Sequence, residues 1–325
     1  MTVGERNCYT ITVAGGITFL FSSLLLAFNA PGFAATGRWH ESVSPNFIVR
    51  HESSFMPPGL LLELGKMHGR LRLDLSMFSP WMAKERIHVY LYSTAKSYVA
   101  GEFKPPAWSN GVAYSERKLI ATHEQAEKRK LIAIMSHEMT HLLFESYWAE
   151  EKKSPPVWIN EGLAMMEEAV DPKLPEDSDW HRSMWVLSQA RPLRLKNFFA
   201  MNPTRDMMHA QKEQVSHWYV QAYSLVYFLY RKHTRMQFRS FCGMLRDGKS
   251  LEQSLWKAYR YASVDKLEAA WRKWLALPEL QEKIRPHEQP RAAASVKAPA
   301  SDGESKRFKN VGFKHFYYHS LVPER

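Results

Sequence analysis

Ser136-His137-Glu138-Met139-Thr140-His141 and, after a short break, Trp158-Ile159-Asn160-Glu161-Gly162-Leu163-Ala164 are the stretches around which the chain is organised. The two histidines of the first stretch stand four residues apart. On an α-helix, residues at that spacing lie on one face about one turn from each other, so both imidazoles can reach a single ion. Glu138 points about a quarter-turn away, where it would contact a metal-bound water instead of the metal.

Glu161 is the candidate third ligand, because it follows His141 by twenty residues within the second stretch. A catalytic zinc site typically has three protein ligands and keeps its fourth position for water. Pro155, Pro156 and Asn160 are typical of a turn and a helix start, which would present Glu161 near a helix N-terminus. The alternative is a buried helix whose histidines only make hydrogen bonds. The two stretches together favour a Zn²⁺ site.

Both stretches resemble the motifs of the gluzincin class of metallopeptidases, and most closely its peptidase-MA-like group of exported bacterial proteins. The likeness runs from about Ser44 to Leu277 and includes Gly111-Val112-Ala113-Tyr114 and Trp218-Tyr219-Val220-Gln221-Ala222-Tyr223-Ser224. It implies an α+β, zincin-like fold in which a small mixed sheet and the active-site helix are followed by a mainly helical lobe. It also implies a Zn²⁺ cofactor and a peptide or protein substrate.

The resemblance further implies a role for each site residue. The two histidines and Glu161 would bind the metal, and Glu138 would act as general base on the metal-bound water. Gluzincins commonly place a tyrosine hydroxyl over the site to stabilise the oxyanion. The family pattern puts this tyrosine at Tyr219, with Tyr223 as the alternative.

Two departures from the family pattern bear on these roles. Several gluzincins carry an aspartate four residues after the glutamate ligand, where it orients a metal-bound histidine, but this chain has Met165 there. Glu168, two turns after Glu161, could take that part instead. The chain also lacks the Gly-x-Met-Glu-Asn stretch that binds a free substrate amine in aminopeptidases of the class. Its absence favours an endopeptidase over an exopeptidase.

Residues 1–34 are expected to be a secretory signal peptide. Arg6 precedes a mostly apolar run at Ile11–Phe28, and Gly32-Phe33-Ala34 supplies small residues for cleavage after Ala34. The alternative is an uncleaved anchor, because the apolar run is just long enough to span a bilayer. We therefore expect an exported protein, periplasmic or secreted, with anchoring in the membrane as the alternative. After cleavage Cys242 would be the one remaining cysteine, and a small buried apolar residue is its expected role.

Residues 35–284 are expected to form the gluzincin-like catalytic domain, α/β to about residue 122 and helical from about residue 123. Strands are predicted from alternating and β-branched runs at Phe47–Arg50, Ile87–Tyr92, Gly111–Tyr114 and Lys118–Ala121. By resemblance, the second or third of these strands would border the site and pair with an extended substrate.

Helices are predicted from three- and four-residue apolar spacing. Thr122 and Gln125 can form a capping box for the helix that carries the histidines and runs to Phe144, and this helix is apolar on more than one face, as expected of a buried helix. The other predicted helices are Leu60–Phe78, Gly162–Val170, Trp218–Tyr230, Phe238–Leu245, Leu251–Tyr259 and Leu267–Leu275.

Residues 285–325 are predicted to be a disordered basic tail, rich in Pro, Ala and Ser. The whole chain carries a formal net charge of +11, which would attract it to an anionic membrane or cell-wall surface. It contains no motif for specific nucleic-acid binding. Two other functions stay open: an inactive zinc-binding envelope or scaffold protein, and a zinc hydrolase of cell-wall amides.

Overall fold

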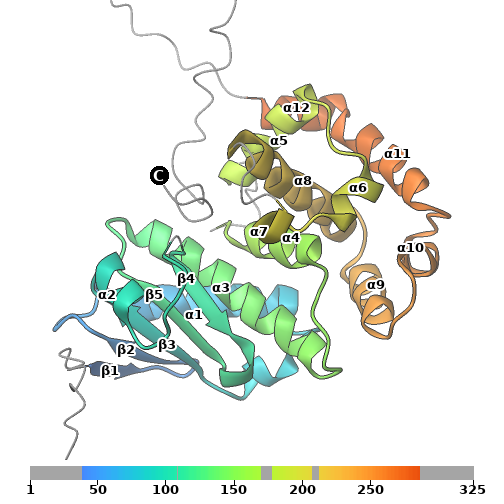
Figure 1. Ribbon diagram of the computed structural model, residues 1–325. Helices are drawn as coiled ribbons and strands as arrows, with labels where there is room; N and C mark the ends of the chain where they lie inside the picture. Colours follow the sequence, from blue (N-terminus) through green and yellow to red (C-terminus); the bar gives the residue numbers. More distant parts are fainter. Residues whose placement is uncertain (1–38, 108, 170–177, 207–211, 286–325) are drawn as a thin grey trace, which may run out of the picture. The chain divides into compact units, whose positions relative to one another are not determined.

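A computed structural model describes residues 39–107, 109–169, 178–206 and 212–285 (Figure 1). The expected signal peptide, with its apolar run at residues 11–28, lies outside the described residues, and so does the predicted tail after Arg285. Among the helices that are described, none combines the length and the apolar character needed to cross a membrane.

A five-stranded mixed sheet forms the first part of the described chain. Its strands lie in the order β1-β2-β3-β5-β4, with parallel pairs at β2–β3 and β3–β5 and antiparallel pairs at both outer positions. β4 is therefore an edge strand, held to the sheet by β5 alone within the described residues. The strands are β1 (His40–Val43), β2 (Phe47–His51), β3 (Ile87–Tyr92), β4 (Gly111–Tyr114) and β5 (Leu119–His123).

The two faces of the sheet bury different side chains, because successive residues of a strand point in opposite directions. From β3, Ile87, Val89 and Leu91 enter the main hydrophobic core. Tyr92 belongs to a smaller cluster on the other face, which includes Tyr98 of α2 (Ala95–Ala100). The alternation read from Ile87–Tyr92 is thus confirmed.

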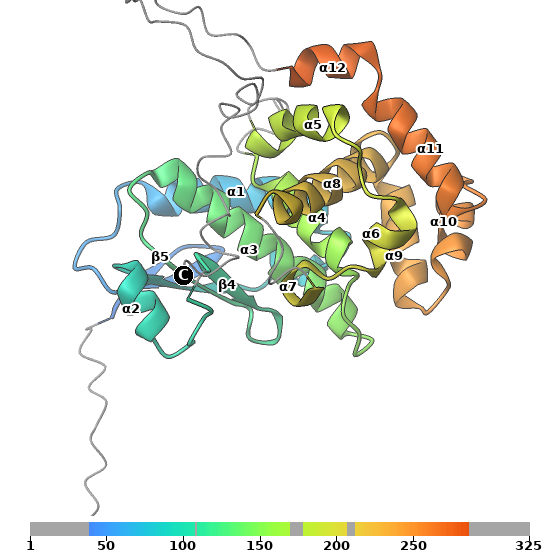
Figure 2. The same ribbon diagram turned by 45° about the horizontal axis from the view of Figure 1, so that its top comes forward.

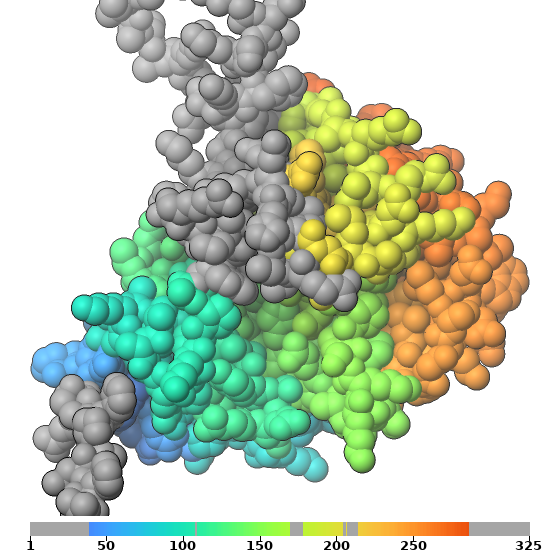
Figure 3. All heavy atoms as spheres, viewed as in Figure 1, coloured from blue at the N-terminus to red at the C-terminus, as the bar shows by residue number. Residues whose placement is uncertain are grey.

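α3 (Lys128–Ala149) is the central helix of the fold. It packs against β4, β5 and α1 (Leu60–Leu75) and, through another face, against α4 (Val157–Glu167). Figures 1 and 2 show it between the sheet and the later helices, and in Figure 3 the green atoms of α3 and α4 separate the teal sheet part from the orange helices. The residues from Leu131 to Phe144 are buried except His141, as the all-round apolar character predicted.

The rest of the described chain is helical and packs around α8. α4 makes its most extensive contact with α8, where Gly162 lies directly against the main chain of Ala222. Cys242 is free and fully buried, as predicted. The helices are α5 (Asp179–Gln189), α6 (Leu195–Ala200), α7 (Pro203–Asp206), α8 (Lys212–Arg231), α9 (Arg235–Arg246), α10 (Leu251–Tyr259), α11 (Val264–Leu275) and α12 (Pro278–Ile284).

The predicted capping box at Thr122 and Gln125 is wrong. Thr122 lies within β5, and its hydroxyl donates a hydrogen bond to the carbonyl of Asn110 (2.7 Å). The chain then remains non-helical until Lys128, after the N-cap residue Glu127. The hydroxyl thus stabilises the sheet instead of a helix end.

α4 also differs from its predicted bounds, since it begins at Val157 and ends at Glu167. Pro156 is the N-cap residue, so Glu161 lies in the second turn and not at the helix start. Glu167 is its last residue and Glu168 its C-cap residue, so the helix ends three positions before the predicted end at Val170. β1 and α2 were not predicted. α5, α6, α7 and α12 lie in the part that was expected to be helical, but their individual bounds were not predicted.

Candidate metal centre

α3 and α4 bring three candidate ligands together. His137 Nε2 and His141 Nε2 are 3.0 Å apart, and Glu161 Oε2 is 4.0 Å from each of these nitrogens. The point equidistant from three atoms with these separations lies about 2.2 Å from each of them, which is close to the ligand distances of Zn²⁺. Among the described residues, these three side chains form a cluster that could hold a metal ion.

The donor set and its burial fit a metal ion with an open coordination position. Two imidazoles and one carboxylate are a ligand set found in catalytic zinc sites. The side chain of His137 is 7% exposed, that of His141 13% and that of Glu161 22%, so the cluster opens toward solvent on the side of Glu161. A cation between the two facing ring nitrogens would satisfy both lone pairs.

The electrostatics of the two histidines differ. The pKa of His137 is lowered to about 4, chiefly by burial and also by the neighbouring His141, while the carboxylates of Glu138 and Glu161 oppose the shift. For His141 burial also lowers the pKa, but Glu161, Glu138 and Glu145 together outweigh it and the net shift is upward. A neutral His137 offers its Nε2 lone pair to a metal.

A carboxylate outside the ligand set orients His137. Its Nδ1 donates to Glu168 Oε1 (2.7 Å), and the indole Nε1 of Trp180 donates to the other oxygen, Oε2 (2.9 Å). This is the arrangement in which a carboxylate fixes the tautomer of a metal-bound histidine. Glu168 thus occupies the place suggested for it, although Met165 stands where several gluzincins carry aspartate.

Glu145 and Asn160 lie near His141. Asn160 Nδ2 donates to Glu145 Oε1 (2.9 Å), and the Glu145 carboxylate helps to raise the pKa of His141. The sequence motifs identify Asn160 only as a helix-start residue, and they do not include Glu145. Both could have been found, because Glu145 lies one helical turn after His141 and Asn160 directly precedes Glu161.

Glu138 lies on the inner side of the cluster, against the edge strand. It is buried, and burial raises the pKa of its carboxyl, while the two histidines lower it by a smaller amount. A Cβ atom at Gly111 of β4 would lie 2.7 Å from Glu138 Cγ and 3.0 Å from Oε1. β4, which is the third predicted strand, therefore borders the site. β3, which is the second, lies inside the sheet.

The two candidate tyrosines have different surroundings. Both are buried, and burial raises the pKa of each phenol well above its usual range. The carboxylate of Glu161 adds to this effect at Tyr219, and the carboxylate of Glu168 adds to it at Tyr223. Tyr223 lies beside His181, with its hydroxyl 3.2 Å from Nδ1.

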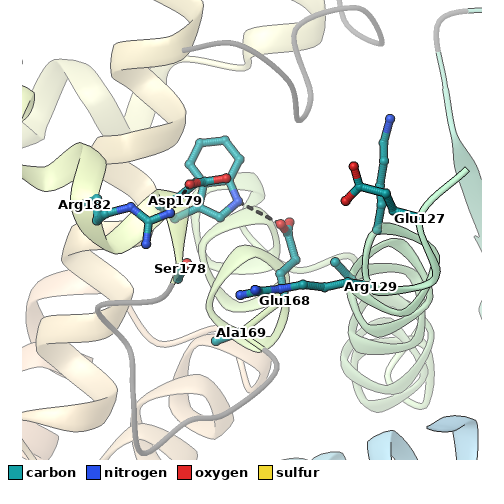
Figure 4. A pocket seen from close by; sticks show the side chains of 10 residues that line it. Glu127, Arg129, Glu168, Ala169, Ser178, Asp179 and Arg182 are labelled. Carbon is teal, nitrogen blue, oxygen red and sulfur yellow. Dashed lines mark hydrogen bonds and ion pairs between the residues drawn. The ribbon is translucent and has the colours of Figure 1, made fainter. Parts of the chain in front are cut away.

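Two cavities flank the three ligands along one face of α3. Ala133, one turn before His137, lines a cavity of about 330 Å³ together with Glu168, and Figure 4 shows it from close by. Glu145, one turn after His141, lines a cavity of about 640 Å³ together with Glu161.

A comparison with known families agrees with this geometry. The sequence model described as the Peptidase MA superfamily matches residues 75–277, which is more than half of the chain and includes α3, α4 and α8. A search of curated proteins returned no match. The family match, together with the mixed α+β architecture, shows that the chain belongs to the peptidase MA superfamily.

Proposed function

We propose that this protein is a zinc-dependent metallopeptidase, with an endopeptidase favoured over an exopeptidase. Members of the peptidase MA superfamily are typically metal-dependent, and family membership supports a peptidase-like protein. The observation that carries the proposal is the convergence of His137, His141 and Glu161 on one point at zinc-ligand distance. The ligand set and the adjoining cavities support a site open to substrate.

In this proposal Zn²⁺ held by His137, His141 and Glu161 would lower the pKa of a bound water to about 7 and polarise the scissile carbonyl. Glu138 accepts a proton from the attacking water and passes it to the leaving amine. Its position beside the ligands, one residue after His137, suits this role. General acid–base catalysis of this kind typically contributes on the order of 10² to 10⁴ in rate.

Two further elements of the chain would bind the substrate. The outer side of β4 has no strand partner among the described residues, so an extended peptide can add to it through main-chain hydrogen bonds. Gly111 places the start of that strand in contact with Glu138. The Tyr219 hydroxyl would donate a hydrogen bond to the oxygen of the carbonyl under attack.

Metal analysis and peptide hydrolysis test the proposal together. The purified protein is expected to contain zinc near one equivalent and to hydrolyse casein, and a chelator is expected to abolish hydrolysis until zinc is restored. Glu138→Gln should retain the zinc and lose activity by about 10²-fold or more. Glu151→Gln, at an exposed position just after α3, is the matched control and should behave like the wild type.

Each of the other outcomes contradicts the proposal in a different way. Full activity of Glu138→Gln would overturn the mechanism. Zinc without hydrolysis of any peptide would identify a binding or scaffold protein, and digestion of purified cell-wall material in preference to casein would identify a cell-wall hydrolase. A protein that binds no zinc would have neither function.

A further inference from the structure

We propose that Trp180 is a positioning residue for the metal centre: its indole holds Glu168 in the orientation in which Glu168 fixes His137. This inference rests on the proposed function, because it concerns how the zinc ligand is held. Trp180 belongs to α5, a helix separate from those that supply the ligands.

The contacts form a continuous chain from α5 to the ligand. Trp180 Nε1 donates to Glu168 Oε2 (2.9 Å), and His137 Nδ1 donates to Glu168 Oε1 (2.7 Å). Each oxygen of the carboxylate thus accepts from a different partner, which fixes the plane of the group. Figure 4 shows the first of these hydrogen bonds as a dashed line across the cavity wall.

The position of Glu168 explains why it needs a second partner. It is the C-cap residue of α4, at the helix end where the backbone dipole disfavours a negative charge. Its side chain is only 7% exposed, so water contributes little to its stabilisation. A buried carboxylate without donors is strongly unfavourable, and the indole N–H supplies a donor that α4 itself cannot offer at this end.

The other groups on the cavity wall are placed less well for this task. Arg182, also on α5, forms an ion pair with Asp179 one turn earlier on that helix. Arg129 is exposed on the first turn of α3, and Figure 4 shows its side chain extending toward Glu168 without a dashed line to the carboxylate. A neutral, partly buried indole fixes a carboxylate without competing with the metal for negative charge.

α5 is itself fixed by contacts deeper in the fold. The residue after Trp180 is His181, which is buried and whose Nδ1 lies 3.2 Å from the Tyr223 hydroxyl of α8. Met184 and Leu187 of α5 enter the main core. The orientation of His137 therefore depends on how α5 is docked, although α5 contributes no ligand.

The test is the zinc affinity of Trp180→Phe, which keeps an aromatic ring and removes the N–H donor. Zinc alone is titrated into the metal-free protein against a competing chelator. Loss of a partner outside the ligand set typically lowers metal affinity about 10- to 100-fold, and we expect a loss in that range. kcat is expected to fall more than KM rises, because the indole acts on the metal ligand His137 through Glu168.

Two variants separate positioning from general destabilisation. Trp185→Phe changes another partly buried tryptophan of α5 and should leave zinc affinity unchanged. Glu168→Gln should weaken zinc binding at least as much as Trp180→Phe, and the double variant should be no weaker than Glu168→Gln alone, since the indole acts through the carboxylate. Simple loss of α5 packing would instead add to the effect of Glu168→Gln.

The outcomes distinguish this inference from the proposed function. A wild-type protein that binds zinc and hydrolyses peptides, with Trp180→Phe at wild-type zinc affinity, would overturn the inference and leave the function standing. Additive losses in the double variant would also overturn it. Failure of the wild type to bind zinc at all would overturn both.

Discussion

Gly111 of β4 and Glu138 of α3 are so close that a Cβ atom added to Gly111 would lie 2.7 Å from Cγ of Glu138. Side-chain atoms do not approach each other to that distance without a shift of one of them. The contact joins the strand to which a substrate would add and the residue proposed as general base. It makes the position of the Glu138 carboxylate depend on the absence of a side chain at residue 111.

Gly111→Ala is therefore expected to lower activity while leaving zinc bound. The added methyl group would displace the flexible Glu138 side chain, and misplacement of a reacting group by about 1 Å can reduce the rate on the order of 10²-fold. The measurement is kcat together with zinc content. Gly65→Ala is the matched control, because an added Cβ at this position of α1 meets no side chain or other segment of the described chain within 4 Å. Unchanged kcat in Gly111→Ala would show that Glu138 can move without loss of function.

Tyr219→Phe and Tyr223→Phe should separate the two candidate tyrosines. Loss of one hydrogen bond to the oxyanion typically lowers kcat about 10²- to 10³-fold, and we expect such a loss in Tyr219→Phe with little change in KM. Tyr223→Phe removes the hydroxyl beside His181 and is expected to affect stability more than kcat. Steady-state kinetics and thermal unfolding of both variants decide the assignment, and the opposite pattern would give the role to Tyr223.

Gly162→Ala tests how tightly α4 must approach α8. A Cβ atom at residue 162 would lie 2.6 Å from the main-chain oxygen of Ala222 and 2.6 Å from a methyl carbon of Val226. A backbone oxygen cannot move aside as a flexible side chain can, so we expect a loss of stability of about 1–3 kcal/mol, as for other overpacked cores. Urea unfolding of the metal-free protein measures it. A variant as stable as the wild type would mean that the two helices can separate freely.

The sequence predicted those site residues whose positions follow from spacing along one helix or within one short motif. His137 and His141 lie one turn apart on α3, and that periodicity needs no knowledge of the fold. The placement of Glu161 beside them depended on the family resemblance and on the second motif, and the structure brings the three together. Their binding of zinc stays a prediction.

The parts that the sequence did not reveal depend on contacts between distant segments. Trp180 reaches Glu168 from a helix whose position is set by core residues such as Met184, and no local spacing indicates that contact. The error at Thr122 has a similar cause, because its hydroxyl has a partner in the loop before β4 and the residue belongs to the sheet. Helix caps and strand ends contain the same residue types, so only the pairing of β5 with its neighbouring strand distinguishes a cap from a strand at Thr122.

The buried cluster of Glu167, Asp74 and Arg231 gives a prediction about pH that is independent of the metal. Arg231 Nη2 lies 2.8 Å from Asp74 Oδ2 and 3.3 Å from Glu167 Oε1, so Arg231 contacts both carboxylates, and Arg235 Nη2 lies 3.1 Å from Asp74 Oδ1. The pKa of Glu167 is raised to about 7, chiefly by burial and also by Asp74, while Arg231 and other arginines oppose the shift. In the unfolded chain the pKa of this carboxyl returns to its ordinary value of 4.5.

Between pH 4.5 and about pH 7, Glu167 binds more protons in the folded protein than in the unfolded chain. The contribution of this group to stability is therefore fully present below about pH 4.5 and is lost as the pH rises through about 7. Glu167→Gln, which stays neutral at every pH, should remove that decline. The free energy of unfolding of the metal-free protein, measured in urea between pH 5 and pH 8, is expected to fall more steeply in the wild type than in this variant.

Glu252→Gln, at an exposed position of α10, should follow the wild-type curve. Parallel curves for the wild type and Glu167→Gln would mean that Glu167 is already ionised throughout this range, with Arg231 neutralising both carboxylates.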